Sequence, residues 1–156
     1  MKRKTISTTK SVIGAFFIIL LFSIGANAAN IKISQRSDGP PYIFSIQIDK
    51  VDKLAGMKLT ITYSEKHLQF QSAKKLASIN SFMHVINDKQ AGKLTFVMAS
   101  AKGISGQNID LFDLTFSSLI QKQLNDFKFE LNTCQLMSET LLEIPCNTST
   151  DSLLAK

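Results

Sequence analysis

The chain has 156 residues, a formal net charge of +6, 44% hydrophobic residues, two cysteines and no tryptophan. This length is enough for one domain with a buried core. The positive charge does not indicate a nucleic-acid partner, because four of the cations lie at the N-terminus and the rest are scattered among acidic residues.

Residues 1–28 have the composition of a signal peptide. Four cations between positions 2 and 10 precede an apolar run from Val12 to Ile24, and Ala26-Asn27-Ala28 offers a cleavage site. The run is shorter than the roughly 20 residues that a membrane span needs, although an uncleaved anchor is the alternative. We therefore expect an exported protein, periplasmic, secreted or at the cell surface, which begins at Ala29 and has no membrane span. Losing the four cations lowers its formal charge from +6 to +2.

Alternation of apolar and polar residues predicts short strands along most of the remaining chain. The predicted strands are 31–33, 42–48, 57–63, 67–73, 77–86, 93–101, 109–119 and the two arms of a hairpin within 127–146. The predicted loops between them include 52–56 and 102–108. Within 77–86, Phe82 breaks the alternation and indicates a bulge or a brief helical turn. We expect an all-β fold, a nine-stranded sandwich over residues 29–147, followed by a flexible tail over 148–156.

The two cysteines, Cys134 and Cys146, lie at equal distances from Thr140, the predicted centre of the hairpin. They would face each other across its arms, with Cα atoms about 4.5 Å apart in a non-hydrogen-bonded pair. Export favours a structural disulfide; free thiols or a redox function are the alternatives.

The sequence offers little for catalysis, and we expect no enzyme activity. His67 and His84 are the only histidines, and neither lies in a metal-ligand or nucleophile motif. Asp110 and Asp113 have odd spacing in one predicted strand, so they should face opposite ways and not form a catalytic pair. No cofactor or metal is expected on this chain.

Two stretches resemble cohesin modules. The first is Leu54-Ala55-Gly56 with the alternating strand that ends at Tyr63, followed by Leu68. The second comprises 92–96, the small-residue loop 103–106 and the segment 111–116. The chain departs from the family by Ser64, where many members have Asp, and by its cysteine pair. The resemblance implies a jelly-roll sandwich that binds a calcium-loaded dockerin module, with the calcium held by the partner.

The resemblance also implies a recognition face built on the strands predicted at 57–63, 77–86, 93–101 and 127–137. Alternation then predicts which side chains of three of these strands point outward. The fourth strand, 77–86, has no clear alternation, and only two of its residues are candidates. The candidate partner-binding residues are Lys58, Thr60, Thr62, Asn80, His84, Thr95, Val97, Ala99, Lys128, Glu130 and Asn132.

Two other functions remain open from the sequence. Related jelly rolls bind polysaccharide through rows of aromatic side chains, but this chain has only Tyr42 and Tyr63 besides core-spaced phenylalanines. A structural subunit of a periplasmic or cell-surface assembly could instead accept a partner strand at an exposed edge of a sheet.

Overall fold

The structure is a computed structural model that describes residues 28–37, 39–119, 127–147 and 154–155. The predicted signal segment therefore lies outside the described residues, except for Ala28, as does most of the predicted tail. The described elements are β1 (Ala29–Gln35), β2 (Tyr42–Tyr63), β3 (Leu68–Lys75), the 3₁₀ turn η1 (Ala77–Ile79), β4 (Met83–Asn87), β5 (Lys93–Ser118), β6 (Phe129–Ser138), β7 (Glu143–Ile144), β8 (Cys146–Asn147) and β9 (Leu154–Ala155).

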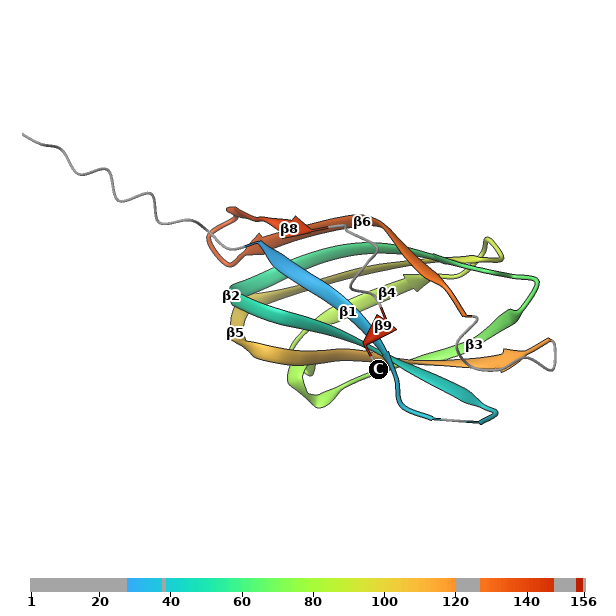
Figure 1. The fold of residues 1–156 in the computed structure, drawn as a ribbon. Helices are drawn as coiled ribbons and strands as arrows, with labels where there is room; N and C mark the ends of the chain where they lie inside the picture. Colours follow the sequence, from blue (N-terminus) through green and yellow to red (C-terminus); the bar gives the residue numbers. More distant parts are fainter. Residues whose placement is uncertain (1–27, 38, 120–126, 148–153, 156) are drawn as a thin grey trace, which may run out of the picture.

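The predicted all-β sandwich is confirmed: the strands form two layers with an apolar core between them (Figure 1). One layer has the order β3–β5–β2–β1, and the other has the order β4–β5–β2–β6. Two strands, β2 and β5, therefore belong to both layers. Phe44 and Phe116 from the first layer and Leu59 and Phe96 from the second are fully buried.

Both long strands bend from one layer into the other at the left of Figure 1. The β2–β5 register shifts between Val51 and Gly56, which is the region where the sequence predicted a loop. That prediction was wrong, and so was the predicted loop at 102–108, because both segments lie within the continuous strands β2 and β5, although Lys53 and Asn108 have φ of 53° and 50°. Polar and glycine-rich composition marks a bend here rather than an end of the strand.

A side chain and a neighbouring strand end satisfy the backbone groups of Lys53 at the bend. The amide of Lys53, a residue with φ of 53°, donates to Ser105 Oγ at 2.8 Å. The carbonyl of Lys53 accepts from the amide of Glu139 at 2.9 Å, and the two side chains form an ion pair at 3.3 Å. The end of the β6–β7 hairpin thus braces the bend of β2.

The segment 77–82, before β4, contains a helical turn, which is one of the two alternatives predicted for the break at Phe82. Phe82 breaks the alternation because it leaves the turn and enters the core, where it is 2% exposed. Lys75 Nζ closes the turn by donating to the carbonyls of Asn80 and Phe82, at 3.0 and 2.9 Å.

Asp110 and Asp113 face the same way, contrary to the prediction. Ile46 pairs with Phe112 and Gln47 with Asp110, so Leu111 is an extra residue in β5 and reverses the alternation. Arg36 contacts both carboxylates, at 2.7 Å from Asp110 and 3.4 Å from Asp113. The hydrogen bond with Asp110 raises the pKa of Arg36, against the opposing effect of burial, so these acids are neutralised by a structural cation.

The cysteines form the predicted disulfide. The pairs Leu136–Ile144 and Met137–Glu143 centre the β6–β7 hairpin on Thr140, as predicted. The Cα atoms of Cys134 and Cys146 are 6.0 Å apart rather than the expected 4.5 Å, because β7 ends at Ile144 and Cys146 pairs with Ala29 in β1 instead. The bond therefore links β6 to the strand that closes on β1.

Replacing Gly103 with alanine should destabilise the fold. A Cβ atom there would lie 2.5 Å from the carbonyl oxygen of Lys53, and the backbone of the bend would have to shift. We expect Gly103→Ala to lower the free energy of unfolding by about 1 to 3 kcal/mol in urea denaturation. Gly39→Ala is the control, because its Cβ would meet nothing within 4 Å. Equal midpoints for the two variants would contradict the close approach at the bend.

Removing the disulfide should cost stability through the unfolded state. The cysteines are 12 residues apart, and opening a loop of this size should lower the free energy of unfolding by about 3 kcal/mol. The measurement is denaturant unfolding of the Cys134→Ala/Cys146→Ala double variant under oxidising conditions. Adding reductant to the original chain should reproduce the loss, and an unchanged midpoint in both cases would refute this role.

Candidate functional site

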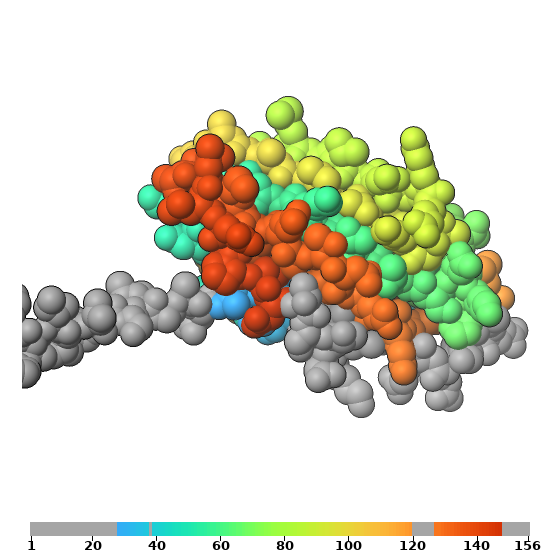
Figure 2. All heavy atoms as spheres, turned by 90° about the horizontal axis from the view of Figure 1, so that it is seen from above, coloured from blue at the N-terminus to red at the C-terminus, as the bar shows by residue number. Residues whose placement is uncertain are grey.

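The four strands that the resemblance assigns to recognition lie side by side. β2 and β5 form the centre of their layer, β4 flanks β5, and β6 flanks β2. We call the solvent-exposed surface of this β4–β5–β2–β6 layer the outer face. Figure 2 shows the layer from above, with its strands forming adjacent bands.

Most of the predicted site residues lie together on the outer face. Lys58 pairs with Val97, Thr60 with Thr95, and Gly56 with Ala99 across β2 and β5. Directly opposed residues of neighbouring strands point to the same side, so these side chains form aligned rows. The remaining members come from β2, from the residue directly before β6 and from β6 itself: Thr62, Lys128, Glu130 and Asn132.

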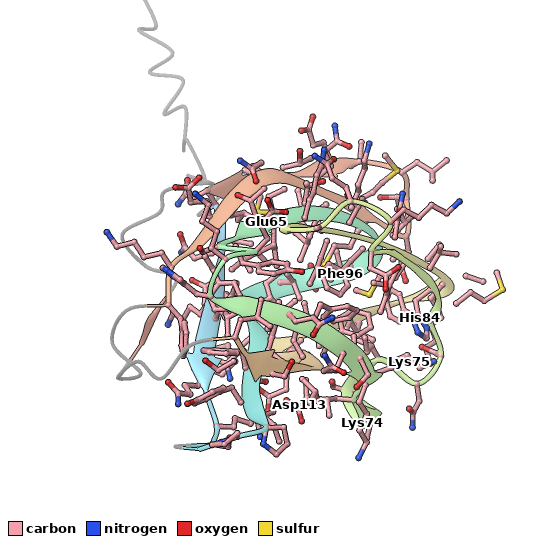
Figure 3. All side chains as sticks on the ribbon, turned by 90° about the vertical axis from the view of Figure 1, so that its right-hand side faces the viewer. Glu65, Lys74, Lys75, His84, Phe96 and Asp113 are labelled. Carbon is pink, nitrogen blue, oxygen red and sulfur yellow. A yellow bond between two sulfur atoms is a disulfide. The ribbon has the colours of Figure 1, made fainter. Side chains whose placement is uncertain are left out.

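Two predicted residues are misplaced. His84 pairs with Met98 and so lies on the side of β4 opposite the outer face, where it is exposed at the edge of the sandwich with its ring 5.6 Å from that of Phe112. Asn80 belongs to the turn after η1, where its carbonyl is bound by Lys75. Figure 3 shows His84 and Lys75 near each other at the side of the sandwich, with Phe96 between the layers. The weak alternation of 77–86 could not give the register of this strand.

The outward residues of β4 are instead Met83, Val85 and Asn87. They pair with Ala99, Val97 and Thr95 of β5 and so extend the same rows to the edge of the sheet. Met83 is 80% exposed and Val85 67%. Both were visible in the sequence as apolar residues of a strand, but without a register they could not be assigned to a face.

A bulge also adds residues from β6. Thr60 pairs with Thr133 and Ile61 with Leu131, which leaves Asn132 as the extra residue. Both Asn132 and Thr133 line the outer face, and Gln135 and Met137 follow on the same side. Strict alternation from Glu130 would have placed Thr133 on the core side.

The outer face has an apolar end and a polar end. At the apolar end, Met83, Val85, Val97 and Met137 are 43–80% exposed. The polar end is a shallow open depression of about 610 Å³. Its lining residues are Lys58, Thr60, Thr62, Gln90, Lys93, Thr95, Asn132 and Thr133.

Arg36 is neutralised by an ion pair, whereas two lysines of the outer face are not. None of the ion pairs found among the described residues includes Lys58 or Lys93. The hydroxyl oxygens of Thr60 and Thr95 lie 3.4 Å apart between these two cations. The polar end therefore presents unneutralised positive charge to solvent, whereas Thr95 is half-buried and Thr60 is only 7% exposed.

The described part of the chain has neither a cluster of metal-ligand side chains nor a helix that could span a membrane. Its His, Cys, Asp and Glu residues include no group of three that could hold a metal ion. None of its helical segments has the length and hydrophobicity to cross a membrane.

The fold is that of the cohesin modules, which match it at low sequence identity. The sixth cohesin of scaffoldin B from Acetivibrio cellulolyticus, solved in complex with a Cel5 dockerin mutant, is 15% identical and has a TM-score of 0.62; the match covers 81% of this chain and 99% of that one. A non-cellulosomal cohesin from Archaeoglobus fulgidus is 13% identical with a TM-score of 0.64, over 81% and 85%. The cohesin module of a family 33 glycoside hydrolase from Clostridium perfringens is 13% identical with a TM-score of 0.63, over 81% and 95%. No family model and no curated protein matches the sequence.

Neighbouring residues of β5 provide a test of the assigned faces. Phe96 is fully buried and Val97 is 46% exposed, so the same truncation should have very different effects. We expect Phe96→Ala to lower the free energy of unfolding by about 3 to 5 kcal/mol and Val97→Ala to change it by no more than about 0.5 kcal/mol. Denaturant unfolding measures both. Comparable losses would show that the outer face has been assigned to the wrong side of β5.

Proposed function

We propose that this chain is a binding module of the cohesin type that recognises another protein through its outer face. One observation carries the proposal: four of the seven large hydrophobic side chains that are exposed among the described residues lie on this face. Scattered exposed apolar residues are ordinary, but a group that comes from three strands and gathers at one end of a single sheet face is typical of an interaction surface. The cohesin fold supports the same interpretation.

We propose a dockerin-type partner that brings its own calcium. The scaffoldin B cohesin, which shares the fold, was solved with a dockerin bound. The outer face itself has hydroxyl, amide, cationic and apolar groups, with Glu130 as its one carboxylate among the residues assigned to it, and so has little to offer a calcium ion. Any dependence of binding on calcium would then arise in the partner.

Polysaccharide is a weaker candidate for the same surface. Neither tyrosine presents its ring on the outer face: Tyr42 is 8% exposed, and the ring of Tyr63 packs against Phe116 at 5.0 Å. The assigned outward residues of the four strands include no aromatic side chain that could stack on a sugar ring.

Addition of a partner strand is also less well supported. Two edge strands are available, because β4 and β3 each pair only with β5 among the described strands. β4 is only five residues long, and the eight-residue β3 has a register shift between Phe70 and Ser72 and ends in two lysines, features that protect an edge from pairing. We therefore propose recognition by side chains, and binding rather than catalysis, by a protein exported through its N-terminal segment.

The proposal is tested by capture from the secreted fraction of the producing cell. Residues 29–156, which contain every described strand, should capture a protein with duplicated D-x-N-x-D-G loops, and a calcium chelator should abolish the capture. Lys58→Glu together with Val97→Asp should reduce the affinity by at least about tenfold, because they place unpaired charge in the contact.

The matched control is Lys50→Glu with Leu119→Asp, which makes the same kinds of change at exposed residues away from the outer face, one in β2 near the bend and one directly after β5. The control variant should bind normally. Capture that is indifferent to the chelator and to both substitutions would refute the proposal, as would retention on polysaccharide alone.

A further inference from the structure

The described strands contain four methionines, and their exposure to solvent divides them into two pairs. Met83 in β4 is 80% exposed and Met137 in β6 is 43% exposed. Met57 in β2 and Met98 in β5 are 4% and 2% exposed, and they pair with each other across the two strands. The fifth methionine, Met1, lies outside the described residues. Solvent therefore reaches two thioether groups on the outer face and almost none in the core.

Both exposed thioethers belong to the apolar end of the outer face. Met83 pairs with Ala99 of β5, and Met137 pairs with Gly56 of β2. Ala99 and Gly56 pair with each other, so three strand spacings, or about 14 Å, separate the two methionines. The two residues between them have one methyl group and no side chain, and they add little that could shield either sulfur from solvent.

Apolar bulk alone does not require sulfur at these positions. Strands favour β-branched residues, and Val85 and Val97 supply exposed bulk of that kind at the same end of the face. Methionine differs from valine in its thioether, which peroxides oxidise to a polar sulfoxide. Oxidation therefore changes the chemistry of two of the four apolar side chains and leaves the two valines as they are.

The usual first target of peroxides, a cysteine thiolate, is absent. Cys134 and Cys146 are the two cysteines of the chain, and they are joined in the disulfide. The chain also has no tryptophan. The export that the N-terminal segment predicts would keep the cysteines oxidised and place the outer face outside the reducing cytoplasm. The two exposed thioethers are then the side chains most open to a peroxide.

Resting on the proposed function, we propose that Met83 and Met137 are sites of oxidation by hydrogen peroxide, and that their sulfoxides weaken recognition at the apolar end of the outer face. One oxygen of the peroxide is transferred to the sulfur: an S–O bond forms, the O–O bond breaks, and the other oxygen leaves as water. The sulfur loses two electrons and the peroxide gains them.

The sulfoxides act by adding polar groups to a contact that excludes water. Each sulfoxide oxygen accepts hydrogen bonds from water, and a partner that fits an apolar surface supplies no donor in their place. Burying a polar group without a hydrogen bond lowers affinity by about tenfold or more. The fold itself is unaffected, because neither Met83 nor Met137 belongs to the hydrophobic core.

The test begins with the order of oxidation. Residues 29–156 are treated with hydrogen peroxide, the peroxide is removed, and each methionine is followed by mass spectrometry of proteolytic peptides. Met83 and Met137 should react before the core pair, and the midpoint of urea unfolding should stay unchanged while only the exposed pair has reacted. Equal rates for the two pairs, or an early loss of stability, would overturn the inference.

The second step measures how oxidation changes the outer face. A butyl-substituted resin probes exposed apolar surface without any partner, and the chain oxidised at the exposed pair should elute from it earlier. Its affinity for the protein captured from the secreted fraction should fall by at least about tenfold when only the immobilised chain has been oxidised. Met83→Leu with Met137→Leu keeps the apolar bulk without the sulfur, so peroxide should change neither the elution nor the capture of this variant.

The outcomes separate this inference from the proposed function. Unchanged elution, equal capture by the untreated and oxidised chains, or an equal loss of capture by the leucine variant after treatment would each overturn the role of the two sulfoxides. The captured partner would then stand without it. Failure of the untreated chain to capture any protein would instead reject the proposed function, and this inference with it.

Discussion

The pairing of β2 with β5 is the constraint on which the rest of the structure depends. It runs from Tyr42–Phe116 in one layer to Thr62–Lys93 in the other. Every other layer-forming strand pairs with one of these two, so their register decides which residues enter the core. It equally decides which residues reach the outer face, because successive side chains of a strand point to opposite sides.

Where the pairing of β2 with β5 is regular, alternation in the sequence was sufficient to assign each residue to a face of the sheet. Lys58 and Thr60 of β2, and Thr95 and Val97 of β5, lie where period-two alternation placed them, since no extra residue interrupts either strand there. The cysteine hairpin was equally predictable, because its symmetry about Thr140 is a matter of counting. In these segments the local pattern and the global fold agree.

The predictions from the sequence that were wrong share one physical cause: they depended on pairing with another strand. Leu111 and Asn132 are extra residues that exist only relative to a partner strand, so nothing in their own strand's pattern reveals the change of face. The bend at 51–56 was mistaken for a loop for a related reason. Polar residues and glycine are typical of loops, but here the groups of Lys53 are satisfied by contacts with Ser105 and Glu139, distant in sequence. The register of β4 likewise depends on β5 and not on its own five residues.

This arrangement separates the requirements of folding from those of recognition along the same strands. Phe96 and Leu59 fix the layer from inside, whereas Val97 and Lys58, one position away, have no role in the core. The chemistry of the outer face can therefore change without altering the register, which agrees with a shared fold at 11–17% identity. The same holds at Gly56, where a Cβ atom would lie 3.4 Å from Cβ of Met137. This is an ordinary van der Waals contact, so packing does not require glycine there and a side chain would only add to the outer face.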